Sequence, residues 1–581
     1  MGNGVTEKRW IFAARDAELE ERLANGLRIS RVLAQLLINR DVRDVETGRA
    51  FLQPQLSGLH DPWLLPDMER ASDRIRDAIR SGEKIVIYGD YDVDGISATA
   101  LLLRCLKMAG ANVEYYLPAR IEEGYGLNLK AVEKIISEGT HLIVTVDCGV
   151  GSLAEAELAR SRGVDLIITD HHEPGHKLPQ AFALVNPKIP TSQYPFKGLA
   201  GVGIAFKLAW ALGKSFSNGT KVSEEFKDFL LDAVSLAALG TVADVVPLRD
   251  ENRVLVKYGL TALGESAAPG IRALIEVANL GDRPLDPYVV GFRLAPRLNA
   301  AGRLGHAKRS VELLTTESTE RAMEIAKELD RENIRRQAIQ REIVDTVRRR
   351  LQEEFAGEPP HAIVLADDGW HVGVIGIVAS KIAEEYHRPT LLISWDEEIG
   401  HGSGRSIENF HLYNALDHCA EMLITFGGHA QAAGLRLERR SFPKFQERLL
   451  EFARASLTPD DLVPSLRIDG EVTLAMLSKP LVREIEMLAP LGDGNPDPML
   501  VVSGVSVGGE IRRMGAEGKH ISFFARQGDA SLRAVGFDMA HFAEMLSQPR
   551  RLWTIAFVPK INRWNDREDV EMTIEDIKEA K

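Results

Sequence analysis

Short apolar segments alternate with helical segments between residues 84 and 170, and this alternation constrains the fold more than any other feature of the chain. Four segments have the composition of buried strands: KIVIYGD (84–90), NVEYYLP (112–118), HLIVTVD (141–147) and VDLIITD (164–170). Segments of helical periodicity lie between them, and those at 96–110 and 129–139 end in glycine. Strands that alternate with helices form right-handed βαβ units, so the pattern predicts a parallel sheet covered by helices.

The rest of the chain contains a second α/β pattern and a β-rich tail. Helices are predicted near 199–212 and 224–239, and a long charged helix from about 317 to 355. The second pattern comprises a strand at 361–367, a helix at 375–386, a strand at 390–395, the segment GHGSGRS (400–406) and a helix that ends at FGGHAQAAGL (426–435). After about residue 462 short strand-like runs dominate, which predicts a small all-β module, a barrel.

The length of 581 residues suggests roughly three to five domains. We expect an N-terminal extension (1–60), a parallel-sheet α/β domain (61–265), an interlobe segment with a long connecting helix (266–356), a smaller α/β domain (357–460) and the β-rich domain (461–581).

The composition limits the possible functions. The net charge is −13, which argues against a protein covered in positive charge; if the chain binds nucleic acid, it must do so in local basic grooves. No apolar run reaches the roughly 18 residues needed to span a bilayer, and the N-terminus lacks the apolar core of a secretory signal, so we expect no membrane association. Three cysteines make no disulfide framework and favour a cytoplasmic location.

Acidic residues follow the predicted strands at the point where each strand ends. Asp90, Asp92 and Asp94 follow the first strand, Asp147 ends another, and the triplet Asp170, His171 and His172 ends a third. Ligands bind at the carboxyl ends of strands in open α/β sheets. Because carboxylates that meet in one crevice repel each other unless a cation lies among them, the pattern predicts a metal site.

Each of these acids has a simpler explanation when it is taken alone. An Asp after a strand is commonly a turn residue or a helix N-cap, and Asp94 before Gly95 fits that role. The segment DYDVDG also resembles the start of an EF-hand loop, but the twelfth position of such a loop is Leu101 and the preceding segment is a strand. The three groups together favour a metal site.

Four motifs resemble those of the DHH phosphoesterase superfamily: GDYDVDG (89–95), VTVDCGV (144–150), ITDHHEPG (168–175) and LGTVADVVPL (239–248). Within it, the chain is most similar to the RecJ family of bacterial exonucleases specific for single-stranded DNA, over nearly its whole length. GRSIENFHLYNAL (404–416) and FGGHAQAAGL resemble the DHHA1 domain, the β-rich tail occupies the place of an OB-fold, and APRLNAAGRLGHA (295–307) resembles a segment between the two lobes.

The resemblance implies two divalent ions, Mn²⁺ or Mg²⁺. Six residues are the implied ligands of these ions: Asp90, Asp92, Asp94, Asp147, His171 and Asp244. Together with His172, they are also the implied catalytic residues. Oxygen ligands suit both ions, and one imidazole shifts the preference toward Mn²⁺. Asp147 is the candidate for the bridge between the ions, and His172 for contact with the scissile phosphate or the leaving oxygen. Asp170 can instead orient a histidine ring.

The resemblance also implies residues that bind the DNA. Ser403 and Arg405, together with Arg120, would bind the 5′-terminal phosphate; the alternative is a glycine-rich turn with a surface arginine. His429 would contact a phosphate, or it is an ordinary histidine after a helix C-cap. Three more residues would contact the DNA strand along its path: Arg297, Asn299 and Arg303. Arg303 can equally form a salt bridge that holds the lobes together.

The β-rich tail and the long helix offer further basic and aromatic residues. The tail has Phe523, Phe524, Phe537, Trp553, Phe557 and Trp564 beside Arg512, Arg513, Lys519, Arg551, Lys560 and Arg563. Half or more of these aromatic side chains are expected in the barrel core, and exposed ones would stack on bases. The helix segment 331–350 has seven arginines against three acids, which is typical of a solvated face and is also compatible with the lining of a groove.

These features predict a metal-dependent exonuclease that degrades single-stranded DNA from the 5′ end during repair and recombination. We expect a monomer that works with a helicase and a single-strand-binding protein. One alternative is a phosphoesterase of the same superfamily that acts on short oligonucleotides or cyclic dinucleotides. Another is an inactive relative that binds single strands as a scaffold, although all the metal-motif residues are present here. A purely single-strand-binding protein leaves the clustered acids unexplained.

Overall fold

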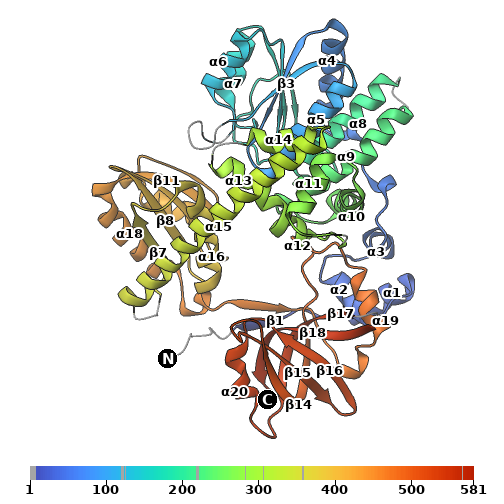
Figure 1. Cartoon of the computed structure of the whole chain (residues 1–581), viewed down its shortest axis with the longest axis vertical. Coiled ribbons are helices and arrows are strands. Elements are labelled where there is room, and N and C mark those ends of the chain that lie inside the picture. The colour runs from blue at the N-terminus through green and yellow to red at the C-terminus, as the bar shows by residue number, and fades with distance from the viewer. Residues whose placement is uncertain are drawn as a thin grey trace.

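The computed structural model describes residues 8–118, 124, 126–217, 221–281, 283–304, 307–355, 359–564 and 567–580. The chain forms two α/β parts joined by the long helix α15 (Thr319–Phe355), with a β-barrel below them (Figure 1). No helix in the described ranges is both long and apolar enough to cross a membrane.

The first α/β part contains the predicted parallel sheet. Its strands are β2 (Lys84–Gly89), β3 (Asn112–Tyr116), β4 (Leu142–Val146), β5 (Asp165–Thr169) and β6 (Ala183–Val185), in the order β3-β2-β4-β5-β6. All neighbouring pairs are parallel. The prediction of a parallel α/β fold is therefore confirmed for this part.

Helices cover both faces of this sheet because alternate strand residues point to opposite sides. Ile85 and Ile87 pack in the large core with α5 (Val93–Met108), α8 (Gly201–Phe216) and α9 (Glu224–Ala243). Val86 and Tyr88 pack on the other face with α6 (Leu129–Ser137) and α7 (Leu153–Ser161). The strands are thus buried on both faces, which explains their continuous apolar composition.

Helix α4 (Met68–Ser81) precedes the first sheet and packs with it. A run of helices after α9 connects the two α/β parts: α10 (Asp250–Glu265), α11 (Pro269–Val277), α12 (Pro287–Val289), the π-helical turn η3 (Val290–Leu294), α13 (Ala295–Leu304), α14 (Lys308–Thr315) and α15. The N-terminal half of α15 packs in the large core through residues such as Ile325 and Leu329. Its C-terminal half packs through Ile343 and Val347 against the second α/β part, so one helix belongs to two cores.

The second α/β part has a mixed sheet in the order β10-β11-β9-β8-β7. Its strands are β7 (Ile363–Asp367), β8 (Thr390–Asp396), β9 (Ile399–Arg405), β10 (Thr425–Gly428) and β11 (Ala432–Glu438). One face packs on α16 (Val372–Tyr386) and α15, and the other on α17 (Leu412–His418) and α18 (Phe442–Ser456).

One prediction and one alternative for this part are wrong. FGGHAQAAGL does not end a helix but forms the hairpin between β10 and β11, so His429 lies in the turn of a hairpin and not after a helix C-cap. GHGSGRS is not a glycine-rich turn but strand β9, paired with β8 and β11. Its glycines fit a strand because side chains of both neighbouring strands fill the space, as Ile393 of β8 and Leu435 of β11 do at Gly402.

The β-rich tail is a closed barrel, as predicted. It comprises β14 (Leu500–Met514), β15 (His520–Gln527), β16 (Ala530–Gly536), β17 (Trp553–Trp564) and β18 (Arg567–Glu579), and the pairing of β14 with β17 closes it. The sequence did not reveal β18, which alternates acidic and apolar residues. Helix α19 (Lys479–Glu486) packs on the barrel.

The N-terminal extension is part of the barrel's core. Strand β1 (Arg9–Phe12) pairs with β12 (Ser465–Ile468), which precedes the barrel. Helices α2 (Arg31–Ile38) and α3 (Val45–Leu52) share a hydrophobic core with barrel residues, and α1 (Ala17–Leu27) packs beside them. Residues 8–52 therefore connect the barrel to the rest of the chain, although they precede it by more than 400 positions.

Candidate active site

The acidic strand ends converge at one edge of the first sheet. Their donor atoms form three overlapping groups, each with all atoms within 4.8 Å: Asp90, Asp92 and Asp147; Asp94, His171 and Asp244; and Asp147, His171 and His172. Asp147 belongs to two of these groups, and so does His171. All seven predicted residues are thus brought together, although they come from segments more than 150 positions apart.

Two of the three clustered aspartates are held by helix N-termini. Asp92, and not Asp94, is the N-cap of α5, because its Oδ1 accepts hydrogen bonds from the backbone N–H groups of Asp94 and Gly95 (2.9 and 3.1 Å). Asp94 instead accepts from the N–H groups of Gly201 and Val202 (2.7 and 2.9 Å), at the start of α8. Since helix N-termini stabilise negative charge, these contacts make the crowding of carboxylates tolerable.

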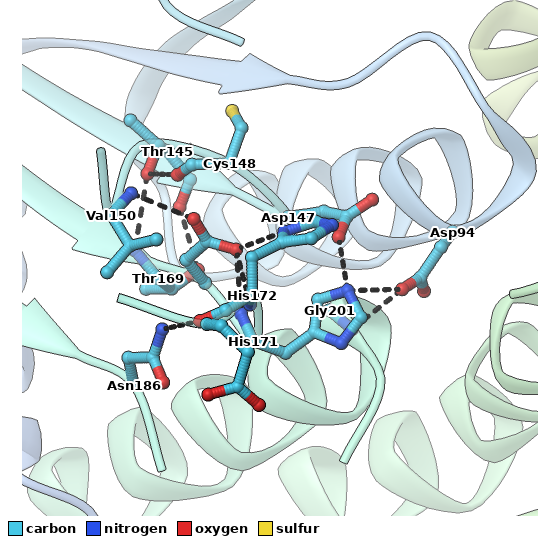
Figure 2. Close-up of polar contacts among 12 residues, drawn as sticks. Asp94, Thr145, Asp147, Cys148, Val150, Thr169, His171, His172, Asn186 and Gly201 are labelled. Atoms are coloured by element: carbon cyan, nitrogen blue, oxygen red, sulfur yellow. Dashed lines mark hydrogen bonds and ion pairs between the residues drawn. The ribbon is translucent and has the colours of Figure 1, made fainter. Parts of the chain in front are cut away.

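The contact between Asp94 and α8 was not predicted from the sequence. The only signal for it is the segment GLAGVGIA (198–205), whose glycines lie just before and within the first turn of a helix. Gly201 must lack a side chain, because a Cβ there would lie 2.5 Å from Asp147 Oδ1. The start of α8 therefore approaches the acids closely enough to donate its amides to one of them (Figure 2).

Asp147 occupies an unusual backbone position at the centre of the cluster. It is 2% exposed and has φ of 63°, a left-handed conformation that residues other than Gly, Asn and Asp rarely adopt. Two hydrogen bonds hold the strand end in place: Thr169 Oγ1 of β5 donates to the carbonyl of Thr145 in β4, and Thr145 Oγ1 donates to that of Cys148, just after β4 (both 2.7 Å; Figure 2). The strained turn directs the Asp147 carboxylate into the site.

His171 presents one ring nitrogen to three carboxylates. Its Nε2 lies 3.1 Å from Asp147 Oδ1, 3.6 Å from Asp244 Oδ2 and 3.9 Å from Asp94 Oδ2 (Figure 2). Burial, together with the charge of His172, lowers the pKa of His171 to about 3. The imidazole is therefore neutral at physiological pH, the form that ligates metal ions.

Crowding and burial make the carboxylates hold their protons more tightly than usual. Burial, and then the charges of neighbouring carboxylates, raise the pKa of Asp94 and of Asp147 well above the usual range. Burial and the charge of Asp92 raise the pKa of Asp244, which caps the end of α9, to about 7. These shifts describe a site without cations, in which the charged forms lack a counter-ion.

Asp170 has a different environment from the other acids. Its Oδ1 accepts hydrogen bonds from the backbone N–H groups of His171 and His172, and it lies 2.7 Å from His172 Nδ1; its Oδ2 accepts from the N–H of Val150. Burial acts to raise the pKa of Asp170, but the hydrogen bond and charge of His172 lower it overall. Asp170 thus sits behind His172 and orients its ring, which faces the cluster (Figure 2).

The donor set fits divalent cations. Asp147 Oδ1, His171 Nε2 and Asp244 Oδ2 are buried, and none has a hydrogen-bond partner among the described residues. Buried polar atoms without partners cost free energy unless an ion or a water molecule satisfies them. Carboxylate oxygens with one imidazole are the ligands expected for Mn²⁺ or Mg²⁺.

The predicted DNA-binding residues lie in two groups. Arg297, Asn299 and Arg303 are on α13; Arg297 forms an ion pair with Asp330 of α15 (2.9 Å), and Arg303 donates to the carbonyl of Gly373 at the start of α16 (3.2 Å). The ion pair of Arg297 thus joins α13 to α15. Arg303 joins the two lobes through a hydrogen bond to a backbone carbonyl.

Ser403, Arg405 and His429 lie together at one end of the second sheet. Arg405 pairs in register with Ala432, whose carbonyl accepts from the N–H of His429. Ser403 Oγ and Arg405 Nη1 are 3.5 Å apart. Arg120, the third predicted contact to a 5′-phosphate, lies outside the described residues.

The barrel divides its aromatic residues as predicted. Phe523, Trp553 and Phe557 are buried in the core, whereas Phe524 and Phe537 are 52% and 59% exposed; the side chain of Trp564 lies outside the described residues. Phe524 on β15 pairs in register with Arg533 of β16, and Arg526 follows it on the same face of the strand. The surface of the barrel thus combines an exposed ring with arginines.

Comparisons with known proteins match this architecture part by part. The DHH family N-terminal domain matches residues 84–238, the DHHA1 domain 360–455 and the RecJ OB domain 468–576. A Bacillus subtilis protein named single-stranded-DNA-specific exonuclease RecJ is 39% identical over 98% of this chain and 71% of its own. The chain belongs to the RecJ family.

Two crystal structures of RecJ from Thermus thermophilus have the same fold. The complex with Mn²⁺ superposes with a TM-score of 0.83 at 32% identity, covering 99% of this chain and 80% of the other. The complex with Mg²⁺ gives a TM-score of 0.77 at 30% identity, covering 99% and 79%. The RecJ fold, the OB-type barrel and the expectation of Mn²⁺ or Mg²⁺ are thereby confirmed.

Mn²⁺ is expected to raise the melting temperature of this RecJ protein, and to raise it more at about pH 8 than at about pH 6. Raised pKa values of Asp94, Asp147 and Asp244 mean that the folded, ion-free protein binds protons more tightly than the unfolded chain. The ion-free fold therefore loses stability as pH rises from about 4 to about 7. Ions that bind must displace the protons held by these carboxyl groups. Fewer protons are bound at the higher pH, so Mn²⁺ should bind more tightly there and stabilise the fold more. Equal shifts at both pH values, with chelator as the reference, would contradict this assignment.

Proposed function

We propose that this chain hydrolyses the phosphodiester bonds of single-stranded DNA from the 5′ end, releasing nucleotides, with two divalent ions at the cluster around Asp147. The observation that carries the proposal is the overlap of the donor groups at one sheet edge: Asp147 belongs both to the group with Asp90 and to the group with His171. Relatives named single-stranded-DNA-specific exonucleases support the substrate.

Each ion is assigned a set of ligands. Asp90, Asp92 and Asp147 form the first; Asp94, His171 and Asp244, with Asp147 shared, form the second. When bound, the two ions lower the pKa of the attacking water and stabilise the charge that develops on the phosphate. The helix N-termini at Asp92 and Asp94 keep two of the ligands fixed, so little reorganisation is needed when the ions bind.

His172 is assigned to the scissile phosphate or the leaving oxygen. Burial acts to lower the pKa of His172, but its hydrogen bond with Asp170 and the charges of Asp170 and Asp244 raise it overall. The raised pKa favours the protonated ring, which can donate a hydrogen bond to a phosphate oxygen or a proton to the leaving oxygen. Asp170 supports this role as a positioning residue, because it holds His172 Nδ1.

The second lobe is assigned to the 5′ end of the strand. Ser403, Arg405 and His429, with Arg120 from the first lobe, would bind the terminal phosphate. Asn299 and Arg303 on α13 would contact the strand between the lobes, while Arg297, which forms an ion pair with Asp330, acts mainly through packing. On the barrel, Phe524 would stack on a base.

A time course on single strands labelled at either end tests the proposal. With Mn²⁺, a 5′-label should appear at once in mononucleotides while the 3′-labelled strand shortens gradually, and a duplex of the same sequence should resist. Chelator should abolish both reactions. Release of the 3′-label first would contradict the polarity, and hydrolysis of dinucleotides but not of long strands would favour a short-oligonucleotide phosphoesterase.

The cellular setting is part of the same proposal. We propose a monomer that acts in DNA repair and recombination in the cytoplasm, where a helicase would supply single strands and a single-strand-binding protein would hold them. All three cysteines are buried and free, which is compatible with a reducing compartment.

A further inference from the structure

Lys188 lies at the edge of the active site, in a segment that follows strand β6. Strands β5 and β6 are parallel, and the last residue of β5 pairs with the last residue of β6. Asn186 and Lys188 therefore follow β6 at the same distances in the chain as Asp170 and His172 follow β5. Because parallel strands end at one edge of a sheet, Lys188 comes to the edge at which the acids cluster.

Asn186 fixes this segment to the backbone of the active-site histidines. It is fully buried, and its Nδ2 donates a hydrogen bond to the carbonyl of His172 (3.0 Å; Figure 2). Its Oδ1 accepts a hydrogen bond from the backbone N–H of Lys188 (2.7 Å). One amide side chain thus couples the backbone position of Lys188 to that of His172, while Asp170 holds the N–H of His172 from the other side.

The ammonium group of Lys188 forms a weak ion pair. Its Nζ lies 3.2 Å from Glu173 Oε1, but the side chain of Glu173 is 71% exposed, whereas that of Lys188 is 25% exposed. Ion pairs with so exposed a partner contribute little stability, because water and salt screen them. Lys188 is therefore a largely covered cation that a phosphate can draw away from Glu173 at low cost.

The charge of Lys188 reaches the metal-binding residues. Burial is the main cause of the lowered pKa of His171, and the charges of His172 and Lys188 act in the same direction. Burial is likewise the main cause of the raised pKa of Asp244, and the charge of Lys188 counteracts it. The ammonium group thus adds positive potential on the side of the cluster formed by His171 and Asp244.

The proposed active site has an excess of negative charge even when both ions are bound. Six carboxylates carry six negative charges against the four positive charges of two divalent ions: Asp90, Asp92, Asp94, Asp147, Asp170 and Asp244. A protonated His172 supplies one of the two missing positive charges, and Lys188 would supply the other. A phosphodiester adds a further negative charge, which a site of net negative charge would repel.

We propose that Lys188 binds a non-bridging oxygen of the phosphodiester that is cleaved, beside His172, and that Asn186 is the positioning residue that holds both. The inference rests on the proposed function, because it assigns Lys188 to the phosphate at the two-ion centre. A lysine ammonium is a flexible point charge with three donors, so it can leave Glu173 and follow the phosphate oxygens as negative charge develops on them.

Two measurements on the Lys188→Gln variant test the proposal. In saturating Mn²⁺ it should hydrolyse single-stranded DNA about tenfold to a hundredfold more slowly than the wild type, a loss at or below the lower end for one stabilising donor, because the side chain is partly exposed. Without DNA it should bind Mn²⁺ at least as tightly as the wild type, because a cation beside His171 and Asp244 has been removed. The rise of the melting temperature in a Mn²⁺ titration measures this affinity. A merely structural role would instead weaken Mn²⁺ binding.

Two further variants test the charge and its placement. Lys188→Arg keeps the positive charge and should recover most of the lost rate. Asn186→Ala should also slow hydrolysis, and adding Lys188→Gln to it should cost clearly less than Lys188→Gln costs in the wild type, because the ammonium group is no longer held in place. Equal costs in both backgrounds would overturn the positioning role of Asn186.

The controls separate this proposal from folding defects and from the proposed function. Lys177→Gln removes an exposed lysine from the loop between β5 and β6 and should keep the wild-type rate and Mn²⁺ affinity. A wild-type rate in Lys188→Gln, or a slower rate together with weaker Mn²⁺ binding, would overturn the inference. The same comparison is made on bis(p-nitrophenyl) phosphate, a small phosphodiester. If the wild-type protein hydrolyses this compound but does not degrade strands from the 5′ end, the proposed function alone fails, and the effect of Lys188→Gln is still measured.

Discussion

The Asp147→Asn variant should hydrolyse single-stranded DNA by about three orders of magnitude more slowly than the wild type, the upper end of the loss on removing one electrostatic stabiliser. Asp147 contributes a donor atom to two of the three groups, so its loss weakens both proposed ion sites at once. Asparagine is a better substitution than alanine, because Asp147 has φ of 63° and asparagine tolerates that conformation. Initial rates of nucleotide release in saturating Mn²⁺ measure the effect.

Three observations accompany this result if the assignment is right. Binding of single strands in chelator should be retained, because the residues proposed to bind the DNA lie elsewhere. The ion-free variant should melt at a higher temperature than the ion-free wild type, because burial makes a carboxylate at this position unfavourable. Glu173→Gln, which removes a nearby exposed acid, should keep the wild-type rate. Substantial hydrolysis by Asp147→Asn would remove the two-ion mechanism.

The Arg253→Met variant should lose about 3–5 kcal/mol of stability, because several buried carbonyls lose their donor and each buried acceptor left unsatisfied costs roughly 1–3 kcal/mol. Arg253 on α10 is buried, and burial, with the charge of Arg40, lowers its pKa to about 9. Its guanidinium donates to five backbone carbonyls: those of Phe51, Met487, Leu488, Ala489 and Pro490. Methionine fills much of the volume but leaves all five acceptors without their donor.

The position of Arg253 makes this a test of how the parts are held together. Its acceptors belong to α3 and to the segment after α19, so one side chain connects the first α/β part, the N-terminal extension and the barrel. Urea unfolding should show the barrel transition at lower denaturant than in the wild type. Arg272→Met, on an exposed face of α11, is the matched control and should unfold as the wild type does. An unchanged transition in Arg253→Met would show that hydrophobic contacts alone hold the barrel.

Much of the fold follows from local patterns in the chain. The strands from 84 to 170 and the helix from 319 to 355 were predicted because hydrophobic periodicity is a property of neighbouring residues. The acids at the strand ends were predicted for a related reason: parallel strands place their carboxyl ends at one edge, so Asp90, Asp147 and His171 meet once the strands pair.

The features that the sequence did not reveal depend on distant contacts. The FGGHAQAAGL segment was taken for the end of a helix, but it is a hairpin because β11 pairs with β9. Strand β18, rich in acids, is a strand because it pairs with β16 and β17 in a closed barrel. The N-terminal extension showed no function, yet its helices complete the core of the barrel.

The sequence by itself determined the alternating elements, the metal-binding residue types and their places at strand ends, because each is encoded within a few neighbouring positions. The tertiary structure decided that the amides of Gly201 and Val202 hold Asp94 and that Arg253 connects three parts of the chain. The physical reason is that hydrogen bonds and desolvation act between groups that become neighbours only when the chain has folded.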